Sequence, residues 1–339
     1  MVPVFLLVQN FRNFPFAGLI CEGICHFRDP MSTSQKTVVI TGASSGIGKS
    51  CVARMSRLGW RVFATVRKQS DSDQLAREFG DNVHPVLMDL ENEASIAAAA
   101  QQIESQAAAH GLDGLVNVAG VGMVRPLEYA SMKDLRQIFD INFFGQIAVT
   151  QALSRLLRKA RGRIVNITSV GVNVAIPFGG LLNASKSAFA KVSDTLRLEM
   201  HPSGVRVIAV EPGAISTPAV DKTLGDLEQV IRNLPPEAQA QYGPLIRKMG
   251  RRGYEMEKNG SSPDVVAQAV QHALTSSRPR IRYRVGKHAR ILATLPKILP
   301  ERVMDALLRK MLGLSDANEP RTQNPAPTPA ARHSAVNPR

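Results

Sequence analysis

Cysteines, aromatic residues and long apolar runs are all scarce in this chain of 339 residues, only 5% of which are aromatic. The three cysteines, Cys21, Cys25 and Cys51, form an odd set without a repeating spacing, which excludes a disulfide framework and favours a reducing compartment. Cys21 and Cys25 lack the further His or Cys partners that zinc needs, so we predict no metal site. No apolar run approaches the roughly 18 residues that span a bilayer. We therefore expect a cytoplasmic protein, or one attached to a membrane surface.

The formal net charge of +14 is unevenly distributed along the chain. Between Arg278 and Leu312, ten Lys and Arg residues stand against two Asp and Glu residues. Such a block can mark contact with nucleic acid or anionic lipid, and it can equally be a solvated face beside a C-terminal helix. We predict the solvated face and no nucleic-acid partner, and we keep peripheral membrane contact through this segment as a hypothesis.

Both ends of the chain differ in composition from the middle. The apolar run at residues 5–8 has no basic residues before it and does not match a secretory signal. We interpret residues 1–35 as a disordered leader or a start-site artefact, with Met31 as the natural start; a real extension is the alternative. Residues 313–339 are rich in Pro, Ala, Asn and Arg, which predicts a disordered tail.

Residues 36–312 alternate short β-branched apolar runs with longer helical patterns, and we predict one domain. The expected strands are 37–41, 61–66, 83–88, 112–118, 163–168, 205–210 and 280–285. The expected helices include 96–109, 135–159, 181–200 and 265–275. Apolar strands separated by helices are typical of a doubly wound parallel α/β sheet of the Rossmann type, with the last strand at its edge.

Residues 214–262 break this alternation, because they contain several prolines and glycines among short helical patterns. A long insertion after a late strand of an open α/β sheet lies beside the carboxyl ends of the strands, where ligands bind. We predict that this covering segment, residues 214–262, lies over a substrate and that a C-terminal helix follows the last strand.

A glycine-rich turn joins the first expected strand to a helix and reads Thr41-Gly42-Ala43-Ser44-Ser45-Gly46-Ile47-Gly48. Glycine lets the backbone approach a pyrophosphate closely, and the start of the helix offers oriented N–H groups. The turn therefore predicts dinucleotide binding. The candidate residues are Gly42, Ser44, Ser45, Gly46, Ile47 and Gly48.

The spacing of this turn, TGxxxGxG, resembles that of the short-chain dehydrogenases/reductases. Further matches follow in chain order over roughly residues 36–312: an acid after the third strand, an NVAG run similar to the family's NNAG, and a PG turn at the nicotinamide end. The resemblance implies further cofactor contacts. These are Asp89, Leu90, Asn117, Ala119, Gly120, Lys186, Pro212, Gly213, Ile215 and Thr217.

The same resemblance implies hydride transfer between nicotinamide C4 and a carbonyl or carbinol carbon, with Asn142, Ser169 and Lys186 as catalytic residues. The family carries a proton-transferring tyrosine four residues before this lysine, and Leu182 occupies that position here. Ser169 lies 13 residues before Leu182, which is the family's usual serine-to-tyrosine spacing, so the register is sound. Leucine cannot donate or accept a proton, and the position therefore lacks its general acid.

Three interpretations of this gap remain open. The protein is a cofactor-binding pseudoenzyme or a badly impaired reductase, with a regulatory or interaction role in the first case. Alternatively, it is an active oxidoreductase with another proton donor: Ser169, Lys186 acting through water, Tyr242 or Tyr254. In the third interpretation it is a structural module that no longer binds cofactor, against which the intact glycine turn argues.

The second expected strand ends in Ala64-Thr65-Val66-Arg67-Lys68, without a carboxylate. NAD-dependent Rossmann proteins usually place an acid here for the ribose 2′-OH, whereas a 2′-phosphate suits a guanidinium group. We therefore predict NADP(H) rather than NAD(H), with Arg67 as a ligand. The alternative is that Arg67 only stacks on adenine and either cofactor binds.

The run from Arg282 to Lys287, before a basic helix, resembles the family branch that acts on steroids, retinoids and other lipophilic alcohols. A small carbonyl or alcohol compound, lipophilic in character, is therefore the expected substrate. The resemblance also implies a homo-oligomer, because helices 135–159 and 181–200 correspond to the pair that forms the family's interface.

Overall fold

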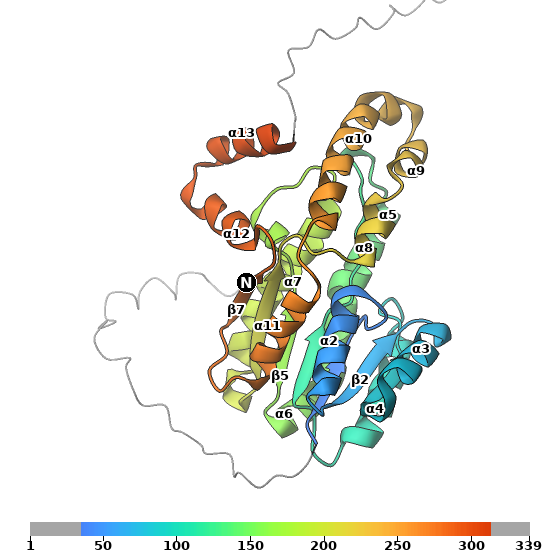
Figure 1. The fold of residues 1–339 in the computed structure, drawn as a ribbon, viewed down its shortest axis with the longest axis vertical. Coiled ribbons are helices and arrows are strands. Elements are labelled where there is room, and N and C mark those ends of the chain that lie inside the picture. Colours follow the sequence, from blue (N-terminus) through green and yellow to red (C-terminus); the bar gives the residue numbers. More distant parts are fainter. Residues whose placement is uncertain (1–34, 313–339) are drawn as a thin grey trace, which may run out of the picture. The chain divides into compact units, whose positions relative to one another are not determined.

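The computed structural model describes residues 35–312, which form a seven-stranded, wholly parallel sheet with helices on both faces (Figure 1). The sheet order is β3-β2-β1-β4-β5-β6-β7. The strands are β1 (Thr37–Ile40), β2 (Arg61–Val66), β3 (Val83–Leu87), β4 (Gly114–Asn117), β5 (Arg163–Ile167), β6 (Arg206–Pro212) and β7 (Arg282–Val285). The predicted doubly wound Rossmann-type sheet is confirmed, with its last strand at one edge.

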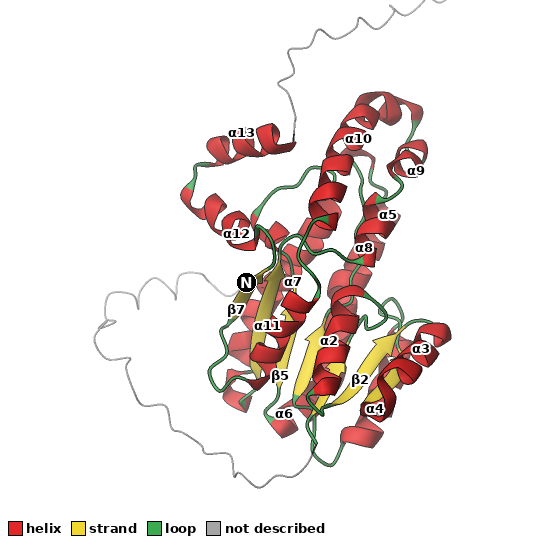
Figure 2. Cartoon of the chain, viewed as in Figure 1, coloured by secondary structure: helices red, strands yellow, loops and turns green. Residues whose placement is uncertain are grey.

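Two apolar cores lie on the two faces of the sheet, because successive strand residues point to opposite sides. In β1, Val38 and Ile40 pack into one core and Val39 into the other. The first core is covered by α2 (Gly46–Arg57), α3 (Gln69–Phe79) and α11 (Asp264–Thr275). The second is covered by α4 (Glu93–Ala107), α6 (Gly145–Ala160) and α7 (Gly180–Glu199). Figure 2 shows the resulting helix–sheet–helix layers.

The strand order reverses between β1 and β4, which are neighbours although they are far apart in the chain. At this point the chain turns to opposite faces after the two strands and opens a crevice at their carboxyl ends. The Thr41 side chain bridges the crevice, since its Oγ1 accepts hydrogen bonds from the N–H groups of Val118 (2.9 Å) and Ala119 (3.1 Å). The glycine turn after β1 is thereby fixed against the end of β4.

The predicted helix over residues 135–159 is not continuous. It comprises α5 (Met132–Phe139), a π-helical turn η4 (Asp140–Phe144) and then α6. The predicted C-terminal helix likewise forms two helices, α12 (Ala289–Ile298) and α13 (Glu301–Leu312). Pro300 separates them, because proline has no N–H to continue the ladder and disfavours a helical residue before it.

The covering segment contains α8 (Pro218–Leu224), α9 (Leu227–Arg232) and α10 (Pro236–Lys258). Figure 1 shows these helices together beyond one end of the sheet. Short 3₁₀ turns complete the described fold: η2 (Gly80–Asn82), η3 (Leu127–Tyr129), η5 (Val170–Asn173) and η6 (His201–Ser203). Within residues 35–312, no helix has the length and apolar character required to cross a membrane. The predicted leader and tail lie outside the described residues, apart from Gln35.

Candidate active site

The glycine turn leaves no space for side chains at two of its positions. A Cβ on Gly42 would lie 2.7 Å from the Ala119 Cα, and Gly42 has a φ of +64°, which favours glycine. A Cβ on Gly48 would lie 2.1 Å from the carbonyl oxygen of Gly42. The turn is therefore closed tightly on itself and against the end of β4, with its backbone accessible to a ligand.

The start of α2 fits an anionic group. Ser45 precedes the helix in an extended conformation, and its side chain does not cap the first helical N–H groups. These groups and the helix dipole favour a pyrophosphate. Gly46 also contacts the chain after β6, because a Cβ there would lie 3.2 Å from the Thr217 Cβ. Ser44 is exposed and Ile47 is half-buried at the same turn.

Arg67 and Lys68 follow directly after β2 and are both exposed. Among the described residues, the Arg67 guanidinium has no hydrogen-bond or ion-pair partner, so its charge remains available to a ligand. The last residues of β2, Ala64 to Val66, are buried and carry no carboxylate. This end of the crevice therefore carries an exposed cation and no carboxylate, and the predicted preference for NADP(H) stays a prediction.

Asp89 is half-buried after β3, and its Oδ1 accepts a hydrogen bond from the Glu91 N–H (3.1 Å). Leu90 beside it is buried, and its carbonyl oxygen lies 2.5 Å from where a Cβ on Gly145 would be. The turn after β3 thus packs against the start of α6, and the Asp89 side chain is held within this turn. Its contact with adenine stays a prediction.

The Asn117 side chain is fully buried and faces the interior. Its Nδ2 donates hydrogen bonds to Thr150 Oγ1 (3.1 Å) and to Asn166 Oδ1 (2.9 Å), which ties β4 to α6 and β5. The Asn117 side chain therefore does not face the crevice, and the predicted cofactor contact here would come from the backbone just after it. Ala119 and Gly120 supply that backbone.

Asn142 lies in the π-helical turn and is fully buried. Its Oδ1 accepts from the Val121 N–H (2.8 Å), while its Nδ2 donates to the Val121 carbonyl (2.9 Å) and to Ser185 Oγ (3.1 Å). The side chain thus pairs with the backbone after β4 as a neighbouring strand would, and it also contacts α7. These contacts place Asn142 between the crevice and Lys186.

Lys186 points from α7 into the same region. Its Nζ donates a hydrogen bond to the Ile167 carbonyl (3.0 Å), and a Cβ on Gly120 would lie 3.2 Å from Nζ and 3.1 Å from Asn142 Oδ1. Burial lowers the pKa of Lys186 to about 8, because the charged ammonium group loses water. The structure therefore brings Gly120, Asn142 and Lys186 together around a buried amine.

Ser169 and Leu182 lie on the two sides of the loop that leads into α7. Ser169 Oγ accepts from the Gly171 N–H (3.0 Å), and a Cβ on Gly171 would lie 3.2 Å from that Oγ and 2.7 Å from Asn183 Oδ1. Leu182 is half-buried and faces Gly122, where a Cβ would lie 3.7 Å from its Cδ2. A leucine side chain therefore borders the site at the position where the family places its phenol.

Neither tyrosine of the covering segment is free to replace that phenol in this conformation. The Tyr242 hydroxyl donates to Glu128 Oε2 (2.6 Å), and this hydrogen bond raises the pKa of Tyr242. The Tyr254 hydroxyl donates to Asp221 Oδ1 (2.9 Å). Both phenols are thus held by exposed carboxylates, Glu128 of η3 and Asp221 of α8.

Glu257 on α10 approaches the nicotinamide-end turn and was not predicted from the sequence. Its Oε2 accepts a hydrogen bond from the Ile215 N–H (3.1 Å), and burial raises the pKa of Glu257. The Gly213 N–H donates to the Val285 carbonyl (2.8 Å), directly after Pro212 at the end of β6. The turn is thus fixed by both α10 and β7, over sequence separations that no local pattern reveals.

The run after residue 281 has a structural role at the sheet edge. Glu211 in β6 is buried and forms ion pairs with Arg282 and with Arg284 (3.1 Å). The Tyr283 hydroxyl lies 2.7 Å from His272 Nδ1 on α11. These side chains hold β7 against the rest of the sheet.

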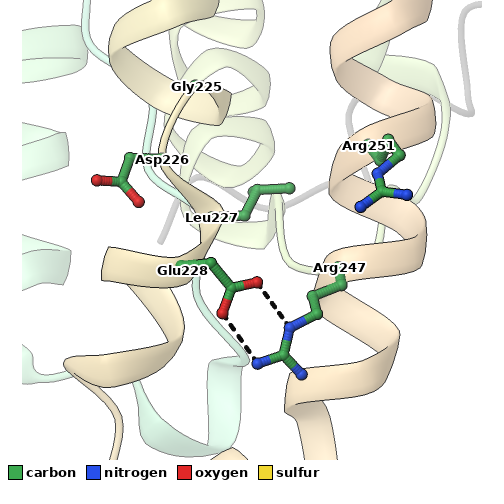
Figure 3. Close-up of a pocket in the computed structure, with 6 residues that line it drawn as sticks. All are labelled: Gly225, Asp226, Leu227, Glu228, Arg247 and Arg251. Atoms are coloured by element: carbon green, nitrogen blue, oxygen red, sulfur yellow. Dashed lines mark hydrogen bonds and ion pairs between the residues drawn. The ribbon is translucent and has the colours of Figure 1, made fainter.

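A shallow cavity of about 200 Å³ lies within the covering segment (Figure 3). Its lining residues are Gly225, Asp226, Leu227, Glu228, Arg247 and Arg251. Figure 3 shows Arg247 paired with Glu228 across it, at 2.7 and 2.9 Å. No residue of the predicted site lines this cavity, and its polar walls do not suit a lipophilic compound.

Comparison with known proteins agrees with the geometry described above. The family model of the short chain dehydrogenases matches residues 36–227. The chain belongs to the short-chain dehydrogenase family. The matched range includes the glycine turn, Asn142, Ser169 and Lys186.

Two relatives are similar over most of their length. Retinol dehydrogenase 5 of Homo sapiens is 35% identical over 293 residues, which cover 84% of this chain and 91% of that protein. The 17-beta-hydroxysteroid dehydrogenase type 6 of Rattus norvegicus is 35% identical over 280 residues, or 80% of this chain and 87% of that protein. The predicted resemblance to the retinol and steroid branch of the family is thereby confirmed.

Solved structures of short-chain dehydrogenases share the fold. A short-chain dehydrogenase from Burkholderia cenocepacia in complex with NADP has a TM-score of 0.61 at 26% identity, covering 81% of this chain and 98% of its own. A 3-ketoacyl-(acyl-carrier-protein) reductase from Brucella melitensis complexed with NADH has a TM-score of 0.59 at 25% identity, covering 73% and 93%. Both nicotinamide cofactors therefore occur among structures with this fold.

Proposed function

We propose that the protein is an NADP(H)-dependent oxidoreductase of lipophilic carbonyl or alcohol compounds whose proton transfer is impaired by Leu182. The observation that carries this proposal is the grouping of Asn142, Lys186 and Gly120 beside Leu182, at the carboxyl ends of β4 and β5. The alternative, a cofactor-binding pseudoenzyme, shares every part of this site and differs only in turnover.

The residues present fit a dinucleotide. The tight turn of Gly42 and Gly48 and the uncapped start of α2 would hold the pyrophosphate, and Arg67 would hold a 2′-phosphate. When bound, NADP(H) supplies or accepts the hydride. Lys186 would hold the nicotinamide ribose through its ammonium group, at the same crevice.

The proton must then come from the chain's own polar groups. Ser169 Oγ is half-buried, and we propose that it orients the substrate oxygen. Lys186, whose pKa is about 8, is largely protonated at neutral pH and lies on the same face of α7 as Leu182. Since a phenol is absent, we propose that Lys186 delivers the proton, directly or through water, at a reduced rate.

The substrate class follows from the relatives. Their names assign retinol and 17-beta-hydroxysteroid substrates to them, and both are lipophilic alcohols. We therefore propose a lipophilic alcohol or ketone for this chain. A panel of such ketones and aldehydes with NADPH tests the proposal: slow turnover supports it, binding of NADPH without any turnover supports the pseudoenzyme, and no binding of NADPH contradicts both.

The cofactor preference predicts the effect of one substitution. Arg67→Ala should weaken NADPH binding roughly 10-fold to 100-fold, since a hydrogen bond to a charged group contributes about 1.5–3 kcal/mol. NADH binding should change little. Cofactor fluorescence titration measures both affinities, with Arg57→Ala, at the far end of α2, as the matched control. Equal binding of NADH and NADPH by the unmodified protein would contradict the preference.

We also propose peripheral contact with anionic membranes through α12 and α13. Three apolar side chains project into solvent here: Ile291 (61% exposed), Ile298 (71%) and Val303 (49%). The exposed cations Arg290, Lys297 and Arg302 lie among them. An apolar surface flanked by cations favours the interface of an anionic bilayer.

Vesicle sedimentation tests this contact. Vesicles with about a third phosphatidylserine should bind the protein at low salt and release it at high salt, since each nearby cation contributes about 1 kcal/mol. The double variant Ile291→Ser/Ile298→Ser should bind several-fold more weakly. Leu198→Ser, which removes an equally exposed apolar side chain from α7, should bind like the unmodified protein. Equal binding by all three proteins would remove the proposal.

A further inference from the structure

Phe178 has a backbone conformation that a bulky residue rarely adopts. Its φ is +63°, and only Arg161 and His288 share a positive φ among the non-glycine residues of the described chain. Those two flank helices, at the end of α6 and before α12. A side chain with a Cβ is strained in this region, and such strain persists only where the surroundings impose it. The contacts of Phe178 should therefore reveal a constraint.

Both the backbone and the ring of Phe178 are held by distant segments. Its carbonyl accepts a hydrogen bond from the Arg125 N–H (3.0 Å). Its ring meets the Tyr242 ring of α10 edge-on, with centroids 5.9 Å apart at 81°. Tyr242 is held in turn by the Tyr129 ring (6.0 Å, 72°) and by its hydrogen bond to Glu128. Phe178 lies in a local turn, which the Gly179 N–H closes by donating to the Ile176 carbonyl (3.1 Å), and the ring contacts link this turn to the covering segment.

These contacts belong to an apolar cluster that is separate from the two cores of the sheet. Its buried members all come from the covering segment: Ile231, Leu234, Ala238 and Ile246. Val124, Tyr129, Phe178, Leu227 and Tyr242 pack around them. The cluster therefore joins three segments: the chain after β4, the loop before α7, and the helices α9 and α10.

The position of Phe178 in the chain links this cluster to the active site. It lies nine residues after Ser169 and four before Leu182. The same loop is closed at its base, where Asn183 Nδ2 donates to the Val174 carbonyl (3.2 Å). Phe178 therefore lies within this closed loop, on the stretch of chain that joins Ser169 to Leu182.

We propose that Phe178 is a positioning residue that couples closure of the covering segment to the placement of Ser169 and Leu182. While Tyr242 packs on the Phe178 ring, the loop keeps its strained form. When α10 moves away, the compensating contact is lost and the loop relaxes. Closure of the covering segment over a ligand and the placement of Ser169 and Leu182 then occur together.

Hydrogen exchange of the full chain, followed by mass spectrometry, tests this coupling without any need for turnover. Phe178→Gly keeps the positive φ and removes the ring, and it should speed exchange in α10 about tenfold. Tyr242→Ala should speed exchange in residues 174–183 by a similar factor. The double variant should exchange no faster than the faster single variant, because both remove the same contact.

Two variants separate coupling from simple damage. Phe178→Tyr retains a ring against Tyr242 and should restore slow exchange in both segments. Phe144→Ala removes an exposed ring from the end of the π-helical turn η4 and should change neither. If Tyr242→Ala does not fold, Tyr242→Leu serves instead, since it keeps apolar bulk and loses the edge-on contact. Changes confined to the substituted segment, or additive changes in the double variant, would overturn the proposal. A failure of the proposed reduction would leave these measurements unaffected.

Discussion

Replacing Leu182 with tyrosine is expected to raise NADPH-dependent reduction of a lipophilic ketone or aldehyde about 100-fold. General acid catalysis typically contributes ~10²–10⁴-fold, and Leu182 removes that contribution from an otherwise assembled site. Ser169, Asn142 and Lys186 keep their places around it. The measurement is the initial rate of NADPH oxidation with the ketone and aldehyde panel.

The geometry around Leu182 favours acceptance of the larger ring. Leu182 precedes Lys186 by one helical turn, so both side chains lie on one face of α7. The side chain is half-buried and borders Gly122, and Gly122 also faces Thr223 of α8. The wall opposite Leu182 thus contains a residue without a side chain, and the larger ring would have to pack between Gly122 and Thr223.

Leu182→Phe is the matched control, because it adds the ring without the hydroxyl. Its rate should remain near that of the unmodified protein, so that the gain of the tyrosine variant reports the proton alone. Equal rates in the two variants would show that proton transfer runs through another group. An unmodified protein that already turns over at ordinary enzyme rates would lead to the same conclusion.

Lys186→Met is expected to stabilise the folded protein at neutral pH while it abolishes most of the reduction. Burial lowers the pKa of Lys186 from 10.5 to about 8, which corresponds to about 3 kcal/mol of unfavourable free energy for the charged form. Loss of the hydrogen bond to Ile167 offsets about 1 kcal/mol of this. The free energy of unfolding should therefore rise by about 2 kcal/mol at pH 7, which thermal and urea unfolding both measure.

The pH dependence of this gain in unfolding free energy identifies the Lys186 ammonium group as its cause. A folded pKa below the unfolded value means that the unfolded chain binds more protons between about pH 8 and pH 10.5. The penalty is complete below pH 8 and disappears as the pH rises toward 10.5. The advantage of Lys186→Met should thus fall from about 2 kcal/mol at pH 7 to less than about 0.5 kcal/mol at pH 9.5.

Lys191→Met is the control for this comparison, since Lys191 lies on the same helix and is exposed. It should change stability little at either pH. The reduction rate of the unmodified protein should also fall above pH 8, where Lys186 loses its proton. A rate that is constant up to pH 10, together with an unchanged stability of Lys186→Met, would exclude a charged Lys186 in the site.

Local patterns predict the sheet well, because its strands are short runs of residues buried on both faces. The strand over residues 61–66 has the predicted bounds, and the helix predicted over 181–200 differs from α7 by one residue at each end. The sequence does not delimit α3, because this helix is mostly polar and Leu75 is its only buried side chain.

Contacts between distant residues decide the features that the sequence does not predict. Asn117 faces inward because Asn166, 49 residues away, accepts its hydrogen bond. The Ile215 N–H is bound by Glu257, 42 residues further along. The turn at Phe178 has a local signal, since Pro177 precedes it and two glycines follow, but the contact with Tyr242 of α10 has none. The roles assigned to the cofactor and catalytic residues, and the expected homo-oligomer, stay predictions.

The π-helical turn makes the length of this segment as important as its composition. In residues 140–144, backbone hydrogen bonds join residues five apart in the chain. The turn therefore holds one residue more than a turn of an α-helix would. Each helical residue advances the side-chain direction by about 100°. Deletion of a single residue here would rotate α5 against α6 by that angle and would separate Asn142 from either Val121 or Ser185. The position of Asn142 thus depends on the number of residues in the turn as well as on their chemistry. The loss of one residue here would disturb the site more than many substitutions around it.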